Sequence, residues 1–252
     1  MEIEQKNYKI LMVEELAAAG NKKAMFEMAR YYLDTKAETL SADKGDLILR
    51  YLLELAKDDD LSEDDSKYAM LLLGIMYYVG RGVEQSYIKA VEWYEKAADK
   101  LDSYGLCNLG YCYYYGRDIP VDYEKAYSCF SQSSFLGNPN AMYKLGDMFY
   151  YGNHIKEDKN AAFFWYREAY KIADNGGYDE KPNVEYRLGK CFLYGHGISE
   201  NLLTALSLLQ NAEVGFFKLI ENGDTFAELT LPKVREELDS ARAMMYHIIG
   251  LE

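Results

Sequence analysis

Hydrophobic and polar positions between residues 69 and 98 follow a helical rhythm in two runs, and a short glycine turn separates the runs. In the first run apolar side chains surround Gly74, and in the second run they recur from Ala90 to Ala97, while Gly80 begins the turn. Apolar residues spaced three and four apart line one face of a helix. The pattern therefore predicts two amphipathic helices joined as a helix-turn-helix hairpin.

The hairpin pattern recurs along the chain. Each copy contains a leucine followed by an anchor glycine, and successive anchors are separated by 36, 36 and 43 residues: Gly74, Gly110, Gly146 and Gly189. A second glycine follows each anchor by six residues: Gly80, Gly116, Gly152 and Gly195. An alanine follows each anchor by sixteen residues: Ala90, Ala126, Ala162 and Ala205. Matched columns over four copies indicate a repeat protein.

Each recurring column has a physical explanation. A glycine inside a helix costs about 1 kcal/mol relative to alanine, so the anchor column predicts a close approach of the partner helix, next to the alanine sixteen residues later. The glycine six residues after the anchor falls where the first helix ends, and it suits the left-handed C-cap conformation. Polar side chains in a later column are predicted to cap the second helix: Ser86, Asp122, Asp158 and Asn201.

The order of these columns, with Leu-Gly, an aromatic residue, Gly-x-Gly-Val, Lys-Ala, Trp-Tyr and Ala-Ala, resembles the Sel-one-like repeat (SLR) family, which is related to the tetratricopeptide repeats. Residues 69–98 match that order closely, and the resemblance covers about residues 66–215. The later copies depart from it at the second turn glycine, which is replaced by Asp118 and His154 and returns as Gly197. The resemblance implies an α/α superhelix that serves as an adaptor or scaffold.

We expect an all-α fold, an α/α solenoid of about five helix-turn-helix repeats with terminal capping helices. The low proline content, four residues in the chain, agrees with this fold class. A single domain is expected over residues 1–252. Its predicted segments are an N-terminal helix over 1–21, a degenerate repeat over 22–57, repeats over 66–101, 102–137, 138–181 and 182–222, and a C-terminal capping helix over 230–250. An insertion over residues 174–182 accounts for the 43-residue step.

The chain is acidic, with 28 Lys and Arg residues against 41 Asp and Glu residues and a formal net charge of −13. Such a charge repels phosphate groups, so nucleic acid and anionic membrane surfaces are not expected partners. The same field steers a basic partner towards the chain. The predicted partner is therefore a protein or peptide, with a preference for basic segments, and no cofactor is predicted.

No basic segment followed by an apolar core opens the sequence, and no apolar run reaches about 18 residues. We therefore predict a cytoplasmic protein, provided that no leader has been removed. Four cysteines form no recurring pair per repeat and are interpreted as structural thiols: Cys107, Cys112, Cys129 and Cys191. Some secreted members of the resembled family carry a disulfide in each hairpin and are linked to β-lactam binding or hydrolysis, and this sequence lacks that cysteine pattern.

Candidate chemistry is sparse. The acidic stretch from Asp58 to Asp65 has the alternating oxygens of a calcium loop but lacks its sixth-position glycine and twelfth-position glutamate, so we interpret it as a solvated loop before a helix. His154, His196 and His247 are the histidines of the chain, and they lack the spacing of metal ligands. No catalytic residue, metal site or enzyme activity is predicted.

The face of each first helix opposite to its core positions is the candidate binding surface, and in the family that this chain resembles that face lines a concave groove. Tyrosine is favoured on recognition surfaces because it offers a large contact area and a hydroxyl group at low entropic cost. The predicted partner-binding residues are Tyr78, Asn108, Tyr111, Tyr115, Tyr143, Lys144, Asp147, Tyr150, Tyr151, Tyr186, Arg187, Lys190 and Tyr194. Alternatively, many of these tyrosines pack between neighbouring repeats.

The predicted function is a protein–protein interaction adaptor or scaffold that binds a peptide or protein partner in this tyrosine-rich concave groove. Two alternatives stay open: a hydrolase acting on β-lactam or peptidoglycan-type substrates, which family analogy alone suggests, and a structural homo-oligomer. The homo-oligomer rests on the amphipathic C-terminal helix, whose apolar positions from Leu231 to Ile248 either cap the stack or pair two copies. We expect a monomer or a weak homodimer.

Overall fold

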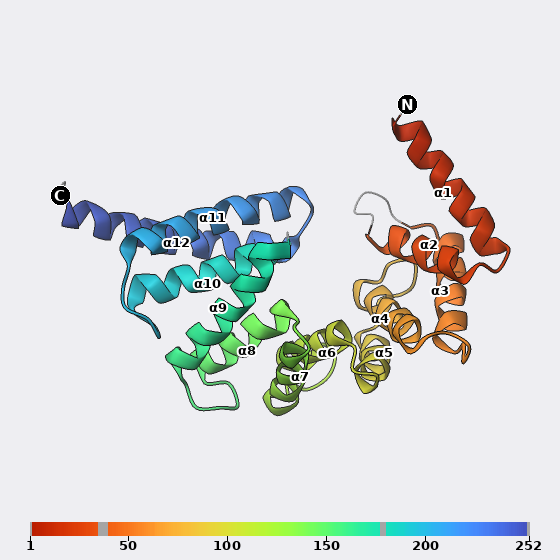
Figure 1. The fold of residues 1–252 in the computed structure, drawn as a ribbon, viewed down its shortest axis with the longest axis horizontal. Helices are drawn as coiled ribbons and strands as arrows, with labels where there is room; N and C mark the ends of the chain where they lie inside the picture. Colours follow the sequence, from red (N-terminus) through yellow and green to blue (C-terminus); the bar gives the residue numbers. More distant parts are fainter. Residues whose placement is uncertain (1, 35–39, 177–179, 251–252) are drawn as a thin grey trace. The chain divides into compact units, whose positions relative to one another are not determined.

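The computed structural model describes residues 2–34, 40–176 and 180–250, and within these ranges the chain forms helices and no strands (Figure 1). The helices are α1 (Glu2–Ala18), α2 (Lys22–Asp34), α3 (Ala42–Ala56), α4 (Glu63–Val79), α5 (Tyr87–Asp99), α6 (Ser103–Tyr115), α7 (Tyr123–Phe135), α8 (Pro139–Tyr151), α9 (Lys159–Gly176), α10 (Lys181–Tyr194), α11 (Leu202–Glu221) and α12 (Thr225–Ile248). Each predicted repeat contributes two of them. The predicted all-α fold of helix-turn-helix repeats is therefore confirmed.

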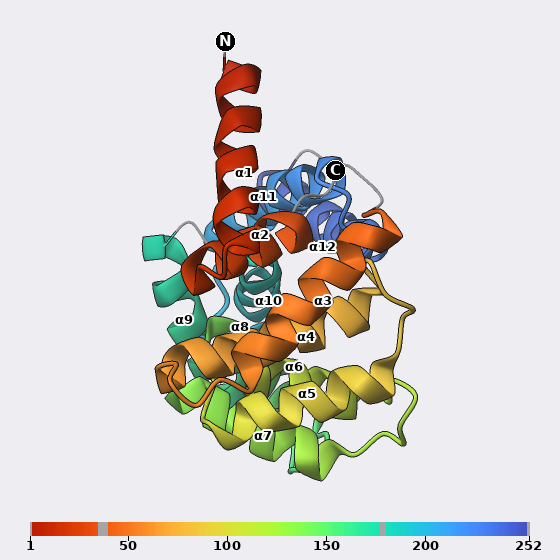
Figure 2. The ribbon, with the colours of Figure 1, turned by 90° about the vertical axis from the view of Figure 1, so that its right-hand side faces the viewer.

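The helices gather into two compact units, Met1–Cys129 (unit 1) and Phe130–Glu252 (unit 2), which divide within α7. Consecutive helices pack against one another from α1 to α6 and from α8 to α12, and Figure 2 shows this for α3, α4 and α5. The first helices of consecutive hairpins also touch, as α2 does with α4 and α4 with α6. This is the packing of a solenoid, in which a hairpin buries its apolar face against its neighbours.

Anchor glycines pack against the second helix of their own hairpin. A Cβ atom built on Gly74 of α4 would lie 2.3 Å from Cε1 of Tyr94 in α5, and one built on Gly146 of α8 would lie 2.5 Å from Cε1 of Tyr166 in α9. Both rings are about 2% exposed. The nearest atoms belong to the large side chain twenty residues after the anchor. The alanine at sixteen is also close at Gly146, where the carbonyl oxygen of Ala162 lies 3.3 Å from the built Cβ.

The turn glycines adopt the left-handed conformation that was predicted for a helix C-cap. Their φ angles are 68° at Gly80, 65° at Gly116, 70° at Gly152 and 68° at Gly195. The second turn position keeps a positive φ although its residue changes, with 72° at Gly82, 51° at Asp118, 70° at His154 and 77° at Gly197. Because the left-handed region costs an L-residue roughly 1–2 kcal/mol, Asp118 and His154 keep the turn at an energetic cost.

Polar caps begin the second helices where the sequence predicts them. In each case a side-chain oxygen accepts the backbone N–H three residues later, and the capping residues are Ser86, Asp122, Asp158 and Asn201. Ser62 caps α4 in the same way. The acidic residues from Glu63 to Asp65 therefore lie in the first turn of α4, where the helix dipole favours carboxylates.

The C-terminal helix is longer than the sequence pattern indicated. α12 begins at Thr225 rather than near residue 230, because Oδ1 of Asp224 accepts the backbone N–H groups of Phe226 and Ala227 and caps the helix there. α11 continues to Glu221, as expected, and packs along α12. The two helices share a buried apolar core and close unit 2.

The four cysteines are buried in helices, and none of them forms a disulfide. Burial raises the pKa of the thiols of Cys112, Cys129 and Cys191 to about 12, since the apolar surroundings disfavour the thiolate. A buried, protonated thiol is a poor nucleophile and a poor metal ligand. The positions and protonation of these side chains agree with structural thiols.

We expect Gly74→Ala to destabilise the chain. The new Cβ would overlap the ring of Tyr94, and such overpacking costs about 1–3 kcal/mol, against the roughly 1 kcal/mol that alanine gains in helix propensity. Urea unfolding followed by circular dichroism measures the net loss. Glu92→Ala, at an exposed position of α5, is the control, and its effect should stay within about 0.5 kcal/mol. A raised unfolding midpoint for Gly74→Ala would contradict the tight contact.

Candidate partner-binding site

The predicted partner-binding residues lie in both units, and each unit holds its own group. Unit 1 holds Tyr78, Asn108, Tyr111 and Tyr115, which belong to α4 and α6. Unit 2 holds the other nine, which belong to α8 and α10. Asn108 is half-buried and hydrogen-bonds the buried hydroxyl of Tyr94, so it supports the core of its hairpin.

In unit 1 the tyrosines pack against one another and against an arginine. Tyr78 is half-buried and meets the ring of Tyr87 edge-on, with ring centroids 5.1 Å apart. Tyr111 and Tyr115 stack at 6.1 Å, and Tyr115 is 48% exposed. The guanidinium of Arg117 lies 5.5 Å from the ring centroid of Tyr115 and 5.7 Å from that of Tyr87. This group therefore presents aromatic rings, and the Arg117 guanidinium makes cation–π contacts with two of the neighbouring rings.

Asp147 is the centre of the group in unit 2. Its carboxylate accepts hydrogen bonds from the hydroxyl of Tyr166 at 2.9 Å and from Nε and Nη2 of Arg187 at 2.6 and 2.7 Å. Nζ of Lys144 donates to it at 3.4 Å. Asp147 is 4% exposed, and a buried carboxylate is tolerated only with such partners. The bidentate pair with Arg187 ties α8 to α10.

The protonation of this cluster is fixed by its own charges. Burial opposes ionisation of Asp147 most strongly, but the positive charges of Arg187 and Lys144, with the hydrogen bonds of Arg187 and Tyr166, outweigh it and hold the pKa of Asp147 below its ordinary value. Burial and the nearby carboxylate raise the pKa of Tyr166 well above its ordinary value. The aspartate therefore stays charged and the tyrosine keeps its proton, which suits a structural ionic network.

Three of the predicted partner-binding residues lie beneath the surface. Tyr143, Lys144 and Asp147 are 5%, 3% and 4% exposed, although the sequence pattern placed them on the groove face. Arg187 covers Tyr143, with its guanidinium 4.6 Å from the ring centroid, while it also pairs with Asp147. Because the Asp147 carboxylate attracts Arg187, the Arg187 side chain lies over the helix face and covers neighbouring residues. These three side chains therefore pack inside the unit, beneath the residues that reach solvent.

Tyr150 joins α8 to the first residue of α9 and to the turn after α10. Its hydroxyl lies 2.8 Å from Nδ1 of His196, and Nζ of Lys159 lies 3.5 Å from its ring centroid and donates to its carbonyl at 2.5 Å. Burial first, and then the positive charges of Lys159 and Lys190, lower the pKa of His196. The imidazole is therefore neutral at pH 7. Tyr150 is half-buried, and burial raises its pKa above the ordinary value.

A small cavity opens beside these residues within unit 2. It has a volume of about 40 Å³ and is lined by Tyr150, Tyr151, Tyr166, Tyr186, Arg187 and Lys190. At its edge, Nζ of Lys190 lies 3.4 Å from Oε1 of Glu237 in α12. The hydroxyl of Tyr194 donates to Oε2 of the same carboxylate at 2.5 Å. Most of the lining residues were predicted to bind a partner, and here they share one cavity.

One repeat position stays exposed in every copy. It lies five residues after the anchor glycine, at the end of the first helix, and its residues are Val79, Tyr115, Tyr151 and Tyr194. Their exposed fractions are 53%, 48%, 59% and 37%. Positions one turn earlier are half-buried or buried, since they pack within the hairpin. Of the predicted partner-binding residues, the exposed ones are the three tyrosines of this column, Tyr115, Tyr151 and Tyr194.

Four residues of the unit 2 group were missed from the sequence: Lys159, Tyr166, His196 and Glu237. Tyr166 lies twenty residues after its anchor glycine, Gly146, and both its ring and its hydroxyl are buried. A hydroxyl in a buried column requires a partner, and the acid at Asp147 on the facing helix was the available signal. Glu237 belongs to α12, outside the repeats, so no column could indicate it.

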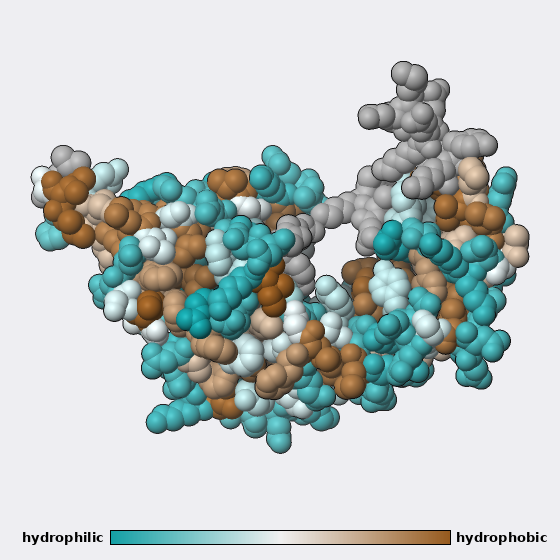
Figure 3. Space-filling view, viewed as in Figure 1, coloured by the Kyte–Doolittle hydropathy of each residue, from teal (hydrophilic) through white to brown (hydrophobic). Residues whose placement is uncertain are grey.

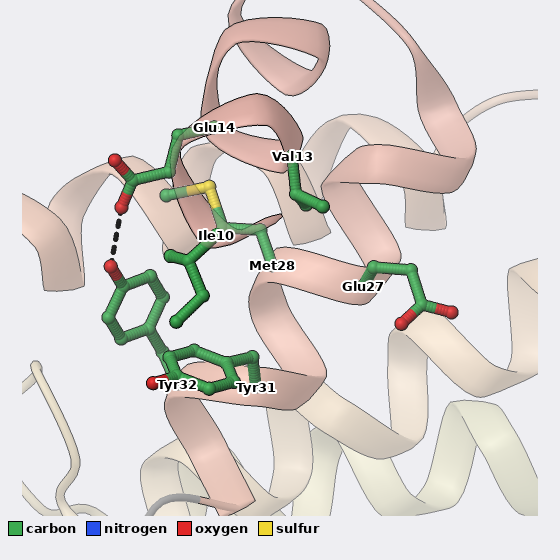
Figure 4. A pocket seen from close by; sticks show the side chains of 7 residues that line it. All are labelled: Ile10, Val13, Glu14, Glu27, Met28, Tyr31 and Tyr32. Atoms are coloured by element: carbon green, nitrogen blue, oxygen red, sulfur yellow. Dashed lines mark hydrogen bonds between the residues drawn. The ribbon is translucent and has the colours of Figure 1, made fainter. Parts of the chain in front are cut away.

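A second pocket, of about 220 Å³, lies between α1 and α2 of unit 1, and Figure 4 shows the side chains that line it: Ile10, Val13, Glu14, Glu27, Met28, Tyr31 and Tyr32. The hydroxyl of Tyr32 hydrogen-bonds Glu14, and Nζ of Lys44 donates to Glu14 at 3.0 Å. The sequence did not indicate this pocket, because it lies in the N-terminal helix and the degenerate first repeat, where the recurring columns are lost.

The described residues contain neither a metal-binding group of side chains nor a helix that could span a membrane. No group of three or more His, Cys, Asp and Glu side chains among them could hold a metal ion. His154 lies exposed in the turn after α8. Within the same ranges, no helix combines the length and the apolar character needed to cross a bilayer.

Stacked hairpins with an anchor glycine and a left-handed turn glycine define an α/α repeat protein. The Sel1 repeat profile matches residues 67–100, 103–138, 139–174 and 182–212, which together exceed half of the chain. These segments coincide with the hairpins from α4 to α11. The chain therefore belongs to the Sel1 repeat family. Sel1 repeats generally serve as scaffolds for protein–protein interaction and are generally non-catalytic.

Two solved structures share this fold. The crystal structure of a Sel1 repeat protein from Oxalobacter formigenes matches with a TM-score of 0.62 at 20% identity, over 100% of this chain and 98% of that chain. The protein c5321, a protective antigen present in uropathogenic Escherichia coli strains and displaying an SLR fold, matches with a TM-score of 0.53 at 20% identity, over 95% of this chain and 59% of that chain. No curated protein matches the sequence.

We expect Asp147→Asn to destabilise the chain by about 3–5 kcal/mol, because it leaves the charges of Arg187 and Lys144 buried without their counter-ion. Urea unfolding at neutral pH measures this loss. Asp239→Asn is the matched control, since it breaks the exposed pair with Arg242, and its effect should not exceed about 1 kcal/mol. Equal losses for the two variants would contradict a buried ionic network.

The same network predicts a pH dependence. The folded pKa of Asp147 lies below its unfolded value of about 3.9, so its contribution is complete above about pH 5 and is lost as the pH falls through the folded pKa. Wild type should therefore lose stability on acidification in this window, and Asp147→Asn should lack that component. Unfolding midpoints measured at a series of acid pH values test the difference, and parallel curves would contradict it.

Proposed function

We propose that this chain is a scaffold that binds a segment of a protein partner on the tyrosine-rich faces of its first helices. The observation that carries this proposal is the exposed column, in which Tyr115, Tyr151 and Tyr194 recur at one repeat position and stay 37–59% exposed. Tyr151 and Tyr194 belong to unit 2 and Tyr115 belongs to unit 1, so each unit offers exposed aromatic contacts of its own to a bound chain. The general role of Sel1 repeats as interaction scaffolds supports the same function.

The charge of the chain favours a partner segment that is basic overall. A net charge of −13 steers cationic segments towards the surface and repels strongly acidic ones. The exposed tyrosine rings add a second attraction, because lysine and arginine side chains bind the faces of aromatic rings. Apolar and cationic side chains on one segment would therefore satisfy both the rings and the overall field.

We expect the triple variant Tyr115→Ser, Tyr151→Ser, Tyr194→Ser to bind peptides at least about tenfold more weakly than wild type, because exposed aromatic anchors contribute most of the binding energy of such surfaces. The peptides are selected on the wild-type chain from a random library. Fluorescence anisotropy of each labelled peptide measures the dissociation constants.

The matched control is the triple variant Tyr104→Ser, Phe164→Ser, Phe217→Ser, which removes aromatic side chains of 49%, 45% and 42% exposure outside the column. It should bind the selected peptides as wild type does. If both triple variants lose binding equally, or if neither does, the exposed column is not the binding surface. Circular dichroism checks that each variant keeps its helices.

Self-association through α12 is a second candidate function, and the exposure of its apolar side chains favours it. Leu229 and Ile248 are 70% and 71% exposed, and Ile249 after the helix is 55% exposed. Figure 3 shows apolar surface at the C-terminal end of α12. A second copy would cover such residues by burying them in a dimer interface.

If α12 forms the dimer interface, light scattering of wild type should give a mass that rises towards the dimer with concentration, because association follows mass action. Ile248→Lys would place a charge in that interface and return the mass to that of the monomer. Lys233→Met, on the same helix, is the control that leaves the apolar residues in place. A wild type that stays monomeric at high concentration would refute this candidate.

A further inference from the structure

The turn of one hairpin reaches back to the hairpin before it. In three of the four copies, the residue seven positions after the anchor glycine contacts the penultimate residue of the preceding first helix. Nη1 of Arg81 donates to the carbonyl of Leu33 at 3.3 Å, Arg117 hydrogen-bonds the hydroxyl of Tyr78, and Nδ1 of His196 lies 2.8 Å from the hydroxyl of Tyr150. This repeat position therefore forms a junction between consecutive hairpins.

The three junctions differ in their chemistry. Arginine keeps its charge throughout the physiological pH range, so acid does not change the charge of Arg81 or Arg117. Histidine changes its charge at about pH 6.5, and His196 stands at the junction between the hairpins α8–α9 and α10–α11. Of these three junctions, the one in unit 2 is therefore the one whose connecting residue titrates in mild acid.

The backbone of the turn that carries His196 packs closely against α9. Gly197 has a φ of 77°, and a Cβ atom built on it would lie 2.2 Å from the carbonyl oxygen of Lys159 and 2.8 Å from Cβ of Phe163. A shift of the turn towards α9 is therefore blocked. A change in the charge of the half-buried His196 side chain thus acts on the contact between the two hairpins.

Two lysines lie at the ring that His196 contacts. The ring centroids of His196 and Tyr150 are 5.4 Å apart, and Nζ of Lys159 and Nζ of Lys190 lie 3.5 Å and 5.6 Å from the Tyr150 centroid. The ring of Tyr194 also faces His196, at 5.6 Å, and burial keeps it protonated by raising its pKa to about 12. A proton on His196 would add a third positive charge beside the lysines, and like charges repel more strongly away from bulk water.

Two carboxylates offset the lysines without cancelling them. Oε1 of Glu157 lies 3.2 Å from Nζ of Lys159, and Oε1 of Glu237 in α12 lies 3.4 Å from Nζ of Lys190. Burial of the imidazole is the largest cause that lowers the pKa of His196, and the two lysines lower it further, while the two glutamates raise it. The balance lies below the ordinary value, so the surroundings favour the neutral ring.

We propose that His196 makes the junction between α8–α9 and α10–α11 a pH-sensitive contact, which holds while the imidazole is neutral and weakens when mild acid protonates it. A neutral ring with its hydrogen on Nε2 accepts the hydroxyl proton of Tyr150 at Nδ1. A protonated ring donates from both nitrogens, so the hydroxyl proton loses this acceptor. Repulsion from Lys159 and Lys190 then favours an imidazole that turns towards water. The inference concerns the stability of unit 2 and does not depend on partner binding.

Mild acid should therefore lower the stability of unit 2. The pKa of a histidine in an unfolded chain is about 6.5, and the folded pKa of His196 is lower, so the unfolded chain takes up the proton first as the pH falls. The contribution of the neutral ring is complete above about pH 7.5 and is lost as the pH falls through the folded pKa. This loss begins above the window of Asp147, which lies below about pH 5.

The first test is an NMR titration of the ring Cε1–H signals in the full chain. The chain has three histidines, and His154→Asn and His247→Gln assign the other two signals. We expect the pKa of His196 to lie below about 6.5, the value of an unperturbed histidine. A measured value at or above the unperturbed one would overturn the proposal, and this measurement needs no substitution of His196.

Lysine variants test whether the charges beside Tyr150 set this titration. Lys190→Met removes one of the two cations and should raise the measured pKa of His196. Lys171→Met is the control, because it removes an exposed lysine that pairs with Glu168 in α9, and it should leave the titration unchanged. Equal shifts in the two variants, or no shift in Lys190→Met, would overturn the role of the cluster.

The second test is urea unfolding of unit 2. Trp93 belongs to unit 1 and Trp165 to unit 2, and they are the two tryptophans of the chain, so Trp93→Phe leaves a fluorophore in unit 2 alone. In this background the unfolding midpoint should fall between about pH 7.5 and about pH 5.5. His196→Gln keeps a neutral side chain and should remove this fall. His196→Arg carries a permanent charge and should have a low midpoint at both pH values.

His154→Asn is the matched control for the unfolding series. His154 lies exposed in the turn after α8 with a φ of 70°, a conformation that asparagine tolerates. This variant should keep the fall of the wild type. Parallel profiles for wild type and His196→Gln would overturn the proposal, and so would a fall that His154→Asn removes. Should the His196 variants fail to fold, the titrations of wild type and Lys190→Met still decide it.

Discussion

The contact on which the structure depends is the one between the anchor glycine of a first helix and the large side chain twenty residues later. In the hairpins of α4–α5 and α8–α9 a tyrosine ring occupies the space that a Cβ atom would need. Only glycine lets the ring approach so closely, and the ring in turn fills the interior of the hairpin. A single hairpin therefore has apolar surface on both sides, and it becomes stable when neighbouring hairpins cover that surface.

The candidate site in unit 2 grows out of that same contact. Asp147 follows the anchor Gly146 directly, so the ring that packs on the glycine carries its hydroxyl to the carboxylate. Arg187 then reaches Asp147 from the next hairpin and joins two repeats. The contact that packs the hairpin is here extended by hydrogen bonds and an ion pair. The cavity lies beside it because Arg187, which pairs with Asp147, also lines the cavity.

Much of the fold was predictable, because the columns report local constraints. A glycine at a C-cap and a serine or asparagine at an N-cap act within a few residues, and each was found where its column placed it. The site was less predictable. Helical spacing placed Asp147 on the outer face, but its burial depends on a cation forty residues later, which the spacing of one repeat does not report. The role of Glu237 depends on α12, where no repeat constrains the sequence.

The buried thiols have a practical consequence. Maleimide reagents attack thiolates, and the thiols of Cys112, Cys129 and Cys191, whose pKa is raised to about 12, carry almost none at neutral pH. The fourth thiol is also enclosed in its helix packing. A cysteine introduced on the outside of the native chain would therefore take up a fluorophore selectively, without prior removal of the natural cysteines. A single introduced cysteine would therefore allow a dye to be attached at a chosen site in either unit for spectroscopy.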